Sequence, residues 1–241
     1  TPSAISDSPT PLVKNKAEEN LDLSSILQLF PLYKGSTWLY SGIEYAQDPN
    51  NPNSRIYAIY HEEDHIIDVK QQPPYYFAHI QKTTTLVKAD QKWWQNNTIP
   101  YLGTINFWYV VYENKIYTTY DSPIDKNFSL NQLQEELDLP LSSGLTWCPN
   151  KNVKQSPTPV AKTPYPCQSA GERKVISNGI RNVQAGNFDS CFELSDNFIS
   201  GGPDQWFCDG VGFVSEGYDH NGSAFGGSKW LLLFVRGANT P

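Results

Sequence analysis

The sequence predicts an all-β protein with few short helices, in which antiparallel strands form curved sheets or half-barrels. Most segments after residue 35 alternate polar and apolar residues or run apolar, and they are rich in Tyr, Ile, Val and Thr. Explicit turn sequences separate these segments, such as Gln-Asp-Pro-Asn-Asn-Pro-Asn at 47–53. A length of 241 residues suffices for one large all-β domain or two small ones.

Helical patterns are confined to two places. Leu21–Leu29 predicts a short helix, and Ser129–Leu137 predicts a better one, with capping oxygens supplied by residues 125–129. The remaining elements are predicted strands. In chain order these are Ser36–Ala46, Arg55–His61, His65–Gln71, Tyr75–Lys88, Ile105–Tyr112, Lys115–Tyr120, Lys174–Asn178, Gly179–Ala185, Asn187–Glu193, Gln205–Ser215 and Ser228–Arg236.

A short sequence pattern occurs twice. Pro31–Trp38 and Pro140–Trp147 both read Pro-Leu-x-x-Gly-x-Thr-Trp, and their starting positions differ by 109 residues. In each copy we expect the Gly to relieve backbone strain in a turn, and the Trp to fill the core at the start of the following strand. The pattern predicts two related β-rich halves, at 29–125 and 140–241, joined by a helical connector at 126–139. Coincidence of common turn residues is the alternative.

The N-terminus and the composition indicate export. The first two dozen residues are rich in Ser, Thr, Pro, Lys and Glu, and we expect residues 1–28 to form a disordered tether behind a signal peptide or a lipid anchor. A tail without a role is the alternative. The net charge of −7 argues against a nucleic-acid partner. No apolar run approaches the roughly 18 residues of a membrane span, so we expect membrane contact only through a lipid anchor on the precursor.

Four cysteines, which allow three pairings, predict disulfide bonds in an extracytoplasmic protein that is secreted or anchored to the cell envelope. Cys191 and Cys208 would oppose each other if their strands formed a hairpin with its turn near residues 199–200. Cys148 and Cys167 would then close a Pro-rich loop. Four reduced, buried thiols are the alternative.

Three motifs carry a resemblance to known proteins. They are Phe-Pro-Leu-Tyr-x-Gly-x-Thr-Trp-x-Tyr at 30–40, Val-x-Ala-Gly-x-Phe-x-x-Cys at 183–191 and Trp-Phe-x-x-Gly-Val-Gly-x-Val at 206–214. Together they resemble a group of uncharacterised bacterial exported proteins and lipoproteins with β-rich domains. The resemblance implies a curved sheet or half-barrel at the cell envelope, similar to lipoprotein carriers, and implies no catalytic activity. Cys208 and the 148–167 insert depart from the pattern.

Residues 61–65, His-Glu-Glu-Asp-His, satisfy the zinc-protease motif H-E-x-x-H. The motif needs a helix to bring both histidines to one face, but β-forming residues flank it on both sides. We therefore expect a polar hairpin tip with His61 and His65 opposed at the ends of two strands. A third metal ligand would have to be His79, His220 or a distant carboxylate. A metal-assisted envelope hydrolase using His61, Glu62 and His65 is thus only an alternative function, and we predict no catalytic residue, metal or cofactor.

Aromatic residues are the remaining candidates for function. Trp93 and Trp94 lie between predicted strands, and exposed tryptophans favour a partner. Anchoring of a long crossover is the alternative for this pair. We predict non-catalytic binding of an apolar, glycan or peptide ligand on a concave aromatic face formed by Trp93, Trp94, Trp108, Tyr109 and Trp206. A structural or assembly module that packs on another envelope protein is a further alternative.

Overall fold

The computed structural model describes residues 21–48, 50–90, 102–124, 129–130, 133–149, 172–196, 204–219 and 225–238. Within these ranges the chain forms one short helix and twelve strands in a single antiparallel sheet. The predicted all-β fold of curved antiparallel sheets is therefore confirmed.

The sheet consists of two six-stranded meanders. The first contains β1 (Thr37–Asp48), β2 (Asn51–Gln72), β3 (Tyr75–Ala89), β4 (Gly103–Tyr112), β5 (Lys115–Thr119) and β6 (Gln134–Asp138). The second contains β7 (Thr146–Trp147), β8 (Arg173–Val183), β9 (Gly186–Asp196), β10 (Asp204–Cys208), β11 (Gly212–Asp219) and β12 (Phe225–Val235).

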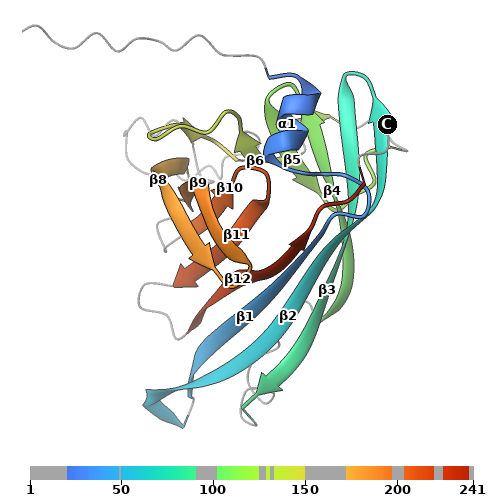
Figure 1. Ribbon diagram of the computed structural model, residues 1–241. Coiled ribbons are helices and arrows are strands. Elements are labelled where there is room, and N and C mark those ends of the chain that lie inside the picture. The colour runs from blue at the N-terminus through green and yellow to red at the C-terminus, as the bar shows by residue number, and fades with distance from the viewer. Residues whose placement is uncertain are drawn as a thin grey trace, which may run out of the picture.

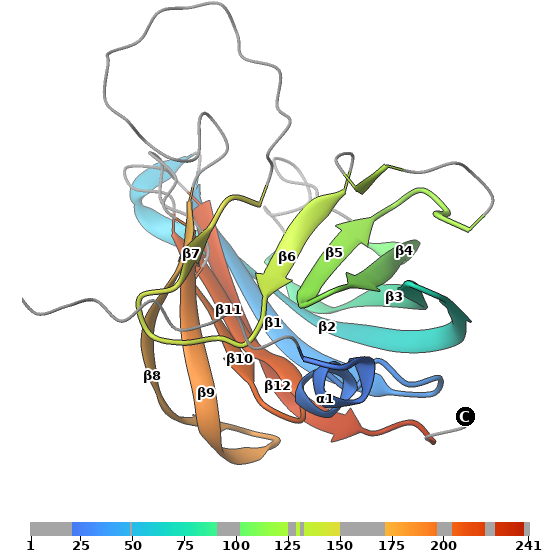
Figure 2. The ribbon, with the colours of Figure 1, turned by 90° about the horizontal axis from the view of Figure 1, so that it is seen from above.

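The two meanders join where β1 pairs with β12, so the strand order is β6-β5-β4-β3-β2-β1-β12-β11-β10-β9-β8-β7. Figure 2 shows β3 to β5 curving away on one side of this junction and β8 to β10 on the other. The curvature brings the two ends of the sheet together. The backbone N–H of Glu135 in β6 donates to the carbonyl of Pro149 beyond β7 (2.9 Å), and the Arg173 guanidinium donates to the Glu136 carbonyl (2.9 Å).

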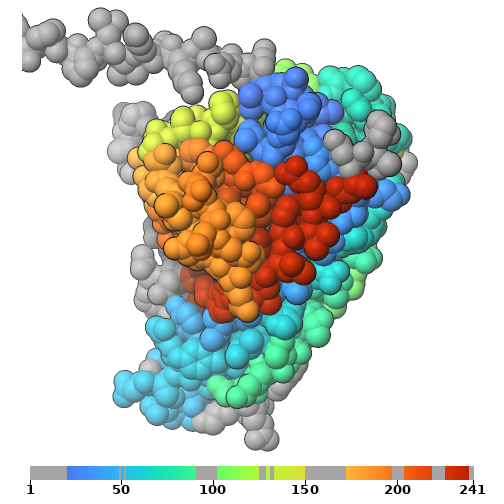
Figure 3. Space-filling model, viewed as in Figure 1, coloured from blue at the N-terminus to red at the C-terminus, as the bar shows by residue number. Residues whose placement is uncertain are grey.

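The predicted N-terminal helix is confirmed as α1, Leu23–Leu29. The Asp22 carboxylate caps it by accepting from the backbone N–H of Ser25 at 2.7 Å. In Figure 1, α1 lies above one end of the interior, between the two meanders. The Leu29 carbonyl accepts from the Gly210 N–H at 2.8 Å, and Figure 3 shows α1 (blue) against the orange and red strands of the second meander.

Phe30, which follows α1, is the centre of an aromatic core that belongs to both meanders. Its ring makes edge-to-face contacts with Trp38, Tyr109, Phe207 and Phe213, at centroid distances of 5.2 to 6.0 Å. Because the two residues from the first meander and the two from the second meet on one buried ring, the halves share this core.

A second cluster covers the opposite face of the first meander. Phe77, Trp108, Val110 and Tyr117 are buried there together with Leu133, which precedes β6. The His79 ring stacks on Trp108 at 4.2 Å, with the two planes 6° apart. This outer face of β3, β4 and β5 is therefore packed by side chains from outside the sheet.

The two copies of the Pro-Leu-x-x-Gly-x-Thr-Trp pattern have matching backbone contacts. The Gly35 N–H donates to the Ile66 carbonyl at 2.8 Å, and the Gly144 N–H donates to the Val175 carbonyl at 2.9 Å. Both donors and both acceptors are 109 positions apart. The glycines have φ values of +84° and +87°, which side chains other than glycine rarely adopt.

The helix predicted over Ser129–Leu137 is wrong, because β6 occupies Gln134–Asp138. Leu133, Glu135, Leu137 and Leu139 are buried at alternate positions, which is the period of a strand. The carboxylate of buried Glu135 accepts from the Lys115 ammonium group on β5. The division into two β-rich halves, at 29–125 and 140–241, stays a prediction.

The hairpin predicted at residues 61–65 is also wrong. Strand β2 runs without interruption through them and pairs with β1 on one side and β3 on the other. Conversely, the strand predicted over Gln205–Ser215 is two strands, β10 and β11, separated by a turn. Gly212, the first residue of β11, has φ +98°, and a Cβ there would lie 2.5 Å from the Phe30 ring.

The Cys191–Cys208 disulfide is confirmed. The two residues are directly opposed on β9 and β10, as the hairpin argument predicts, with a Cα–Cα distance of 4.0 Å. Cys148 is disulfide-bonded as well. Its expected partner, Cys167, lies outside the described residues, as do residues 1–20 of the predicted tether.

Candidate functional site

The concave interior of the sheet contains two adjoining pockets of about 210 and 320 Å³, which together we call the interior cavity. The first lies beside Phe30, which follows α1, and the second extends toward Glu44 and Tyr218. Side chains that line both pockets are those of Lys82, Ile105, Tyr120, Glu216 and Lys229. The larger pocket is at the lower end of the size range of sites that hold small ligands.

Strand alternation explains which residues reach the cavity. On β2, Tyr60, Glu62, Asp64 and Ile66 share one face, and the first three line the cavity. The same period on β3 directs Lys82 inward together with the buried Ile80. Charged residues therefore occupy positions in phase with the apolar core.

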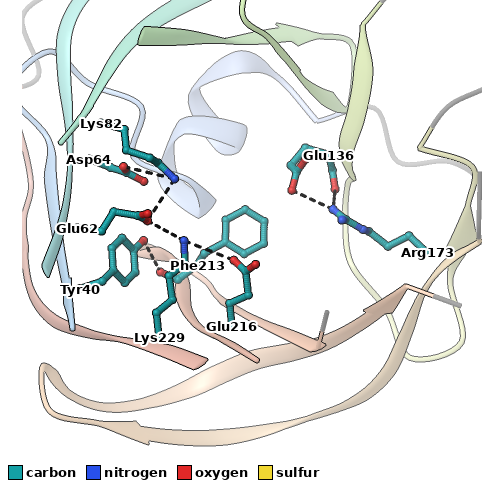
Figure 4. A network of polar contacts seen from close by, with 9 residues as sticks. All are labelled: Tyr40, Glu62, Asp64, Lys82, Glu136, Arg173, Phe213, Glu216 and Lys229. Carbon is teal, nitrogen blue, oxygen red and sulfur yellow. Dashed lines mark hydrogen bonds and ion pairs between the residues drawn. The ribbon is translucent and has the colours of Figure 1, made fainter. Parts of the chain in front are cut away.

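Five of these charged side chains form the interior charge network, which consists of Glu62, Asp64, Lys82, Glu216 and Lys229 (Figure 4). Glu62 is central, because its Oε1 accepts from Lys229 at 2.7 Å and from Lys82 at 3.2 Å. Lys229 also lies 3.4 Å from Glu216, and Lys82 lies 3.7 Å from Asp64. The network joins β2, β3, β11 and β12, so it spans the junction of the two meanders.

The two carboxylates on β2 differ in their electrostatic environment. Burial alone would raise the pKa of Glu62, but Lys229 and Lys82 overcome this effect and lower the pKa to about 2. Burial also raises the pKa of Asp64, and the attraction of Lys82 is too weak to compensate, so this pKa rises to about 6. Burial opposes the charged form of Lys229, yet the surrounding carboxylates, Glu216 foremost, hold its pKa well above the ordinary value.

Asp64 is the incompletely satisfied member of the network. Its side chain is 15% exposed, and among the described residues its buried Oδ1 has no hydrogen-bond partner. The 3.7 Å separation from the Lys82 ammonium group is an ion pair without a hydrogen bond. A buried acceptor in this state costs free energy, and the accessible remainder of the Asp64 carboxylate lines the cavity.

Aromatic rings line the cavity beside these charges. The Lys229 ammonium group lies 5.1 Å from the centroid of Tyr40, whose hydroxyl donates to the Phe213 carbonyl at 2.9 Å. The Lys82 ammonium group lies 5.6 Å from the centroid of Phe107. Tyr120 lines both pockets while 77% exposed, so its ring is accessible at the cavity rim.

The structure separates the aromatic residues that the sequence predicts as ligand-binding. Tyr109 lines the first pocket. Trp108 lies on the opposite face of β4, in the outer cluster with His79, and Trp206 lines neither pocket but has the Arg181 guanidinium 4.9 Å from its ring. Trp93 and Trp94 lie outside the described residues. Ligand binding by these residues stays a prediction.

The H-E-x-x-H residues cannot bind one metal ion together. Glu62 faces the cavity, whereas His61 and His65 are one position out of phase with it and lie on the outer face of β2. The His65 ring is hydrogen-bonded to the Thr37 hydroxyl at 2.7 Å. Across the described residues, no group of three metal-ligating side chains has a geometry that could hold an ion.

A second buried network lies where the ends of the sheet meet. Arg173 on β8 donates to both carboxylate oxygens of Asp196 on β9, at 2.5 and 2.9 Å. Its Nη1 also donates to the Glu136 carboxylate of β6 at 3.0 Å, and Glu136 lines the first pocket (Figure 4). Arg173 thus links one wall of the interior cavity to the second meander.

Sequence reasoning misses the interior charge network. A usable signal is the position of Glu62 and Asp64. Together with Tyr60 and Ile66 they occupy every second position of the strand, so all four are expected on the same, inward face. Lys82 and Lys229 are similarly in phase with the buried Ile80 and Leu231. The pairing itself is not readable, because Lys229 is 167 positions from Glu62.

Comparisons with known proteins identify similar structures but no family. No family profile and no curated protein matches the chain. A presumed exported protein with a YmcC-like fold from Bacteroides fragilis is 11% identical, with a TM-score of 0.44, and the match covers 86% of this chain and 99% of that one. A presumed lipoprotein from Parabacteroides distasonis is 12% identical, with a TM-score of 0.41, covering 86% and 97%.

Both neighbours are described as the kinds of protein that the sequence motifs resemble, but likeness at this level assigns neither family nor function. In the described part of the chain, no helix has the length and hydrophobicity needed to cross a membrane.

Proposed function

We propose that this protein is an extracytoplasmic, non-catalytic binding protein whose interior cavity takes a small saccharide. The observation that carries the proposal is the combination of aromatic rings and buried charges on the walls of one cavity. Sugars present apolar ring faces and many hydroxyl groups, so they can use both kinds of wall. The exposed ring of Tyr120 at the rim offers a surface for stacking.

The charge network favours a saccharide over an apolar ligand. An apolar molecule in the cavity would remove water from Glu62, Lys82 and Lys229 without offering hydrogen bonds in return. A hydroxyl-rich ligand can replace the water that it displaces. A purely structural role is less favoured, because a network of buried charges stabilises a fold less well than apolar residues of similar volume.

The proposed extracytoplasmic location is supported by the disulfide bonds. Cys191–Cys208 and the bonded Cys148 are typical of proteins from oxidising compartments. Alkylation of free thiols in intact cells, followed by non-reducing peptide mapping, tests this location. We expect all four cysteines to be recovered in disulfides, whereas alkylated cysteines would contradict it.

We also propose that the two halves are related by duplication. The support is the 109-residue offset shared by the two Gly turns and by their carbonyl acceptors, Ile66 and Val175. Registers agree as well: Trp38 pairs with Asp64 on β2, and Trp147 pairs with Arg173 on β8, again 109 positions later.

A saccharide screen tests the binding function. We expect some members of a panel of mono- and disaccharides to raise the thermal midpoint of the wild-type protein by mass action. Replacing the rim aromatic in Tyr120→Ala should weaken binding about tenfold, equivalent to about 1.4 kcal/mol. Tyr57→Ala is the matched control, because Tyr57 is an exposed tyrosine that lines neither pocket.

The screen also contains outcomes that contradict the proposal. Equal losses in the Tyr120 and Tyr57 variants would exclude binding at the cavity rim. A folded wild-type protein that responds to fatty acids or short peptides, and to no saccharide, would replace the proposed ligand class. No response to any of the three classes would favour a structural or assembly role.

A further inference from the structure

The interior charge network is one positive charge short. Among the described residues, three carboxylates, those of Glu62, Asp64 and Glu216, face the ammonium groups of Lys82 and Lys229. With all five ionised, the network carries a net charge of −1. The imbalance is located in a cavity wall, where a low effective dielectric makes it count more than it would on the surface.

Asp64 is the carboxylate of the network that is least well paired with an ammonium group. Both ammonium groups are hydrogen-bonded to Glu62, at 2.7 and 3.2 Å, and Lys229 lies 3.4 Å from Glu216. Asp64 has Lys82 at 3.7 Å, and within the described residues no donor reaches its buried Oδ1. Asp64 lines the first pocket, so a bound molecule could approach this carboxylate.

The other charged side chains that line the interior cavity are also negative. Glu44 and Glu136 are further carboxylates on the cavity wall, and among its described lining residues Lys82 and Lys229 are the only cationic ones. Glu136 is paired with Arg173 at 3.0 Å, and Glu44 is hydrogen-bonded to Tyr218, which leaves Asp64 as the carboxylate most in need of a partner. A cavity of this charge attracts cations and repels anions.

We infer that the ligand of the proposed saccharide site is an amino sugar, whose protonated amine pairs with the accessible part of the Asp64 carboxylate and supplies the missing positive charge. The inference rests on the proposed saccharide-binding function and narrows its ligand class. A neutral hydroxyl could donate to the same carboxylate but would leave the net charge of −1 in place. The walls also suit a cation, because the rings of Tyr40 and Phe107 already have ammonium groups within 5.1 and 5.6 Å.

Two disaccharides of similar shape test the inference. The β-1,4-linked glucosamine dimer and cellobiose differ by an amine in place of one hydroxyl on each ring. Calorimetric titration at pH 7 should show that the wild-type protein binds the glucosamine dimer at least tenfold more tightly than cellobiose. The Asp64→Asn variant should bind the two sugars within about twofold of each other. Asp68→Asn, the same change at an exposed position of β2, should retain the wild-type preference.

The possible failures are distinguishable. Equal affinity of the wild-type protein for both sugars would refute the amino-sugar inference and leave the proposed saccharide site intact. A preference for the amine that survives Asp64→Asn would refute the role of this carboxylate. Binding of neither sugar, by wild-type protein that melts cooperatively, would count against the saccharide site and the amino-sugar inference together.

Discussion

Two acidic residues on one face of β2 should respond in opposite ways to removal of their charge. Asp64 and Glu62 are two positions apart, and both line the interior cavity. Glu62 accepts hydrogen bonds from two lysines, whereas the buried Oδ1 of Asp64 has no hydrogen-bond partner in the described residues. We expect Asp64→Asn to stabilise the protein at neutral pH and Glu62→Gln to destabilise it.

The expected gain for Asp64→Asn follows from its pKa. Burial raises this pKa from 3.8 to about 6, which corresponds to about 3 kcal/mol at roughly 1.4 kcal/mol per pKa unit. Because the folded-state pKa is the higher one, the wild-type protein loses this stability as pH rises from 3.8 through about 6. The asparagine variant does not titrate, so its advantage should be full near pH 7.5 and small below pH 4.

The sign is reversed for Glu62→Gln. The lysines lower the pKa of Glu62 from 4.5 to about 2, which again corresponds to about 3 kcal/mol. Here the folded-state pKa is the lower one, so the stability is present above pH 4.5 and is lost as pH falls toward 2. The glutamine variant should therefore lack about 3 kcal/mol at pH 7.5, and it also leaves two buried ammonium groups without this carboxylate.

Urea denaturation at pH 7.5 and pH 4, followed by tryptophan fluorescence, measures both changes. In thermal melts at pH 7.5, 3 kcal/mol corresponds to a shift of roughly 6–12 °C for a protein of this size, upward for Asp64→Asn and downward for Glu62→Gln. Destabilisation of similar size in both variants would refute the reasoning, because it would mean that Asp64 is as well paired as Glu62. A gain for Asp64→Asn that is equal at the two pH values would exclude ionisation as its cause.

Three further tests concern the fold. Gly144→Ala should lower the free energy of unfolding by about 1 kcal/mol because φ is +87°, and Gly35→Ala, at +84°, should cost a similar amount if the two turns are equivalent; urea denaturation compares them. Arg173→Met should cost about 3–5 kcal/mol, since its buried carboxylate partners lose their counter-ion, and a loss below 1 kcal/mol would contradict this. Breaking the Cys191–Cys208 bond by changing both residues to Ser should cost about 3 kcal/mol for a separation of 17 residues, and an unchanged urea midpoint would be evidence against that contribution.

The fold class was predictable because local pattern and tertiary structure agree over most of the chain. Predicted strands such as Tyr75–Lys88 and Ile105–Tyr112 differ from β3 and β4 by two residues or fewer at either end. Prediction is wrong where a charged residue is buried because it pairs with an oppositely charged residue on another strand. Glu135 breaks the apolar alternation of β6, and the Lys115 ammonium group on β5 offsets the cost of its burial.

The candidate site was less predictable for the same reason. The run His-Glu-Glu-Asp-His at 61–65 indicates a turn, because three consecutive acidic residues are rarely found inside a long strand. It is a strand because Lys82 and Lys229 neutralise the charge of Glu62 inside the cavity. Trp108 and Tyr109 are both predicted for the concave face, but strand alternation places one of two neighbours on each side. Alternation alone could not assign Trp108 to the outer face, since the outer cluster depends on Leu133.

Within the interior charge network, Asp64 is the residue whose ionisation most lowers the stability of the fold. It is also the residue that most favours the proposed binding of a cationic ligand. Asparagine at position 64 would match the shape of Asp64 and avoid the cost of about 3 kcal/mol that follows from its raised pKa. A side chain that serves only to fill the cavity wall therefore has no need of the charge. A bound cation would compensate for that charge, so ligand binding should stabilise the wild-type protein more than Asp64→Asn and reduce the difference in their melting temperatures. If the difference is unchanged at saturating glucosamine dimer, the charge of Asp64 does not contribute to binding.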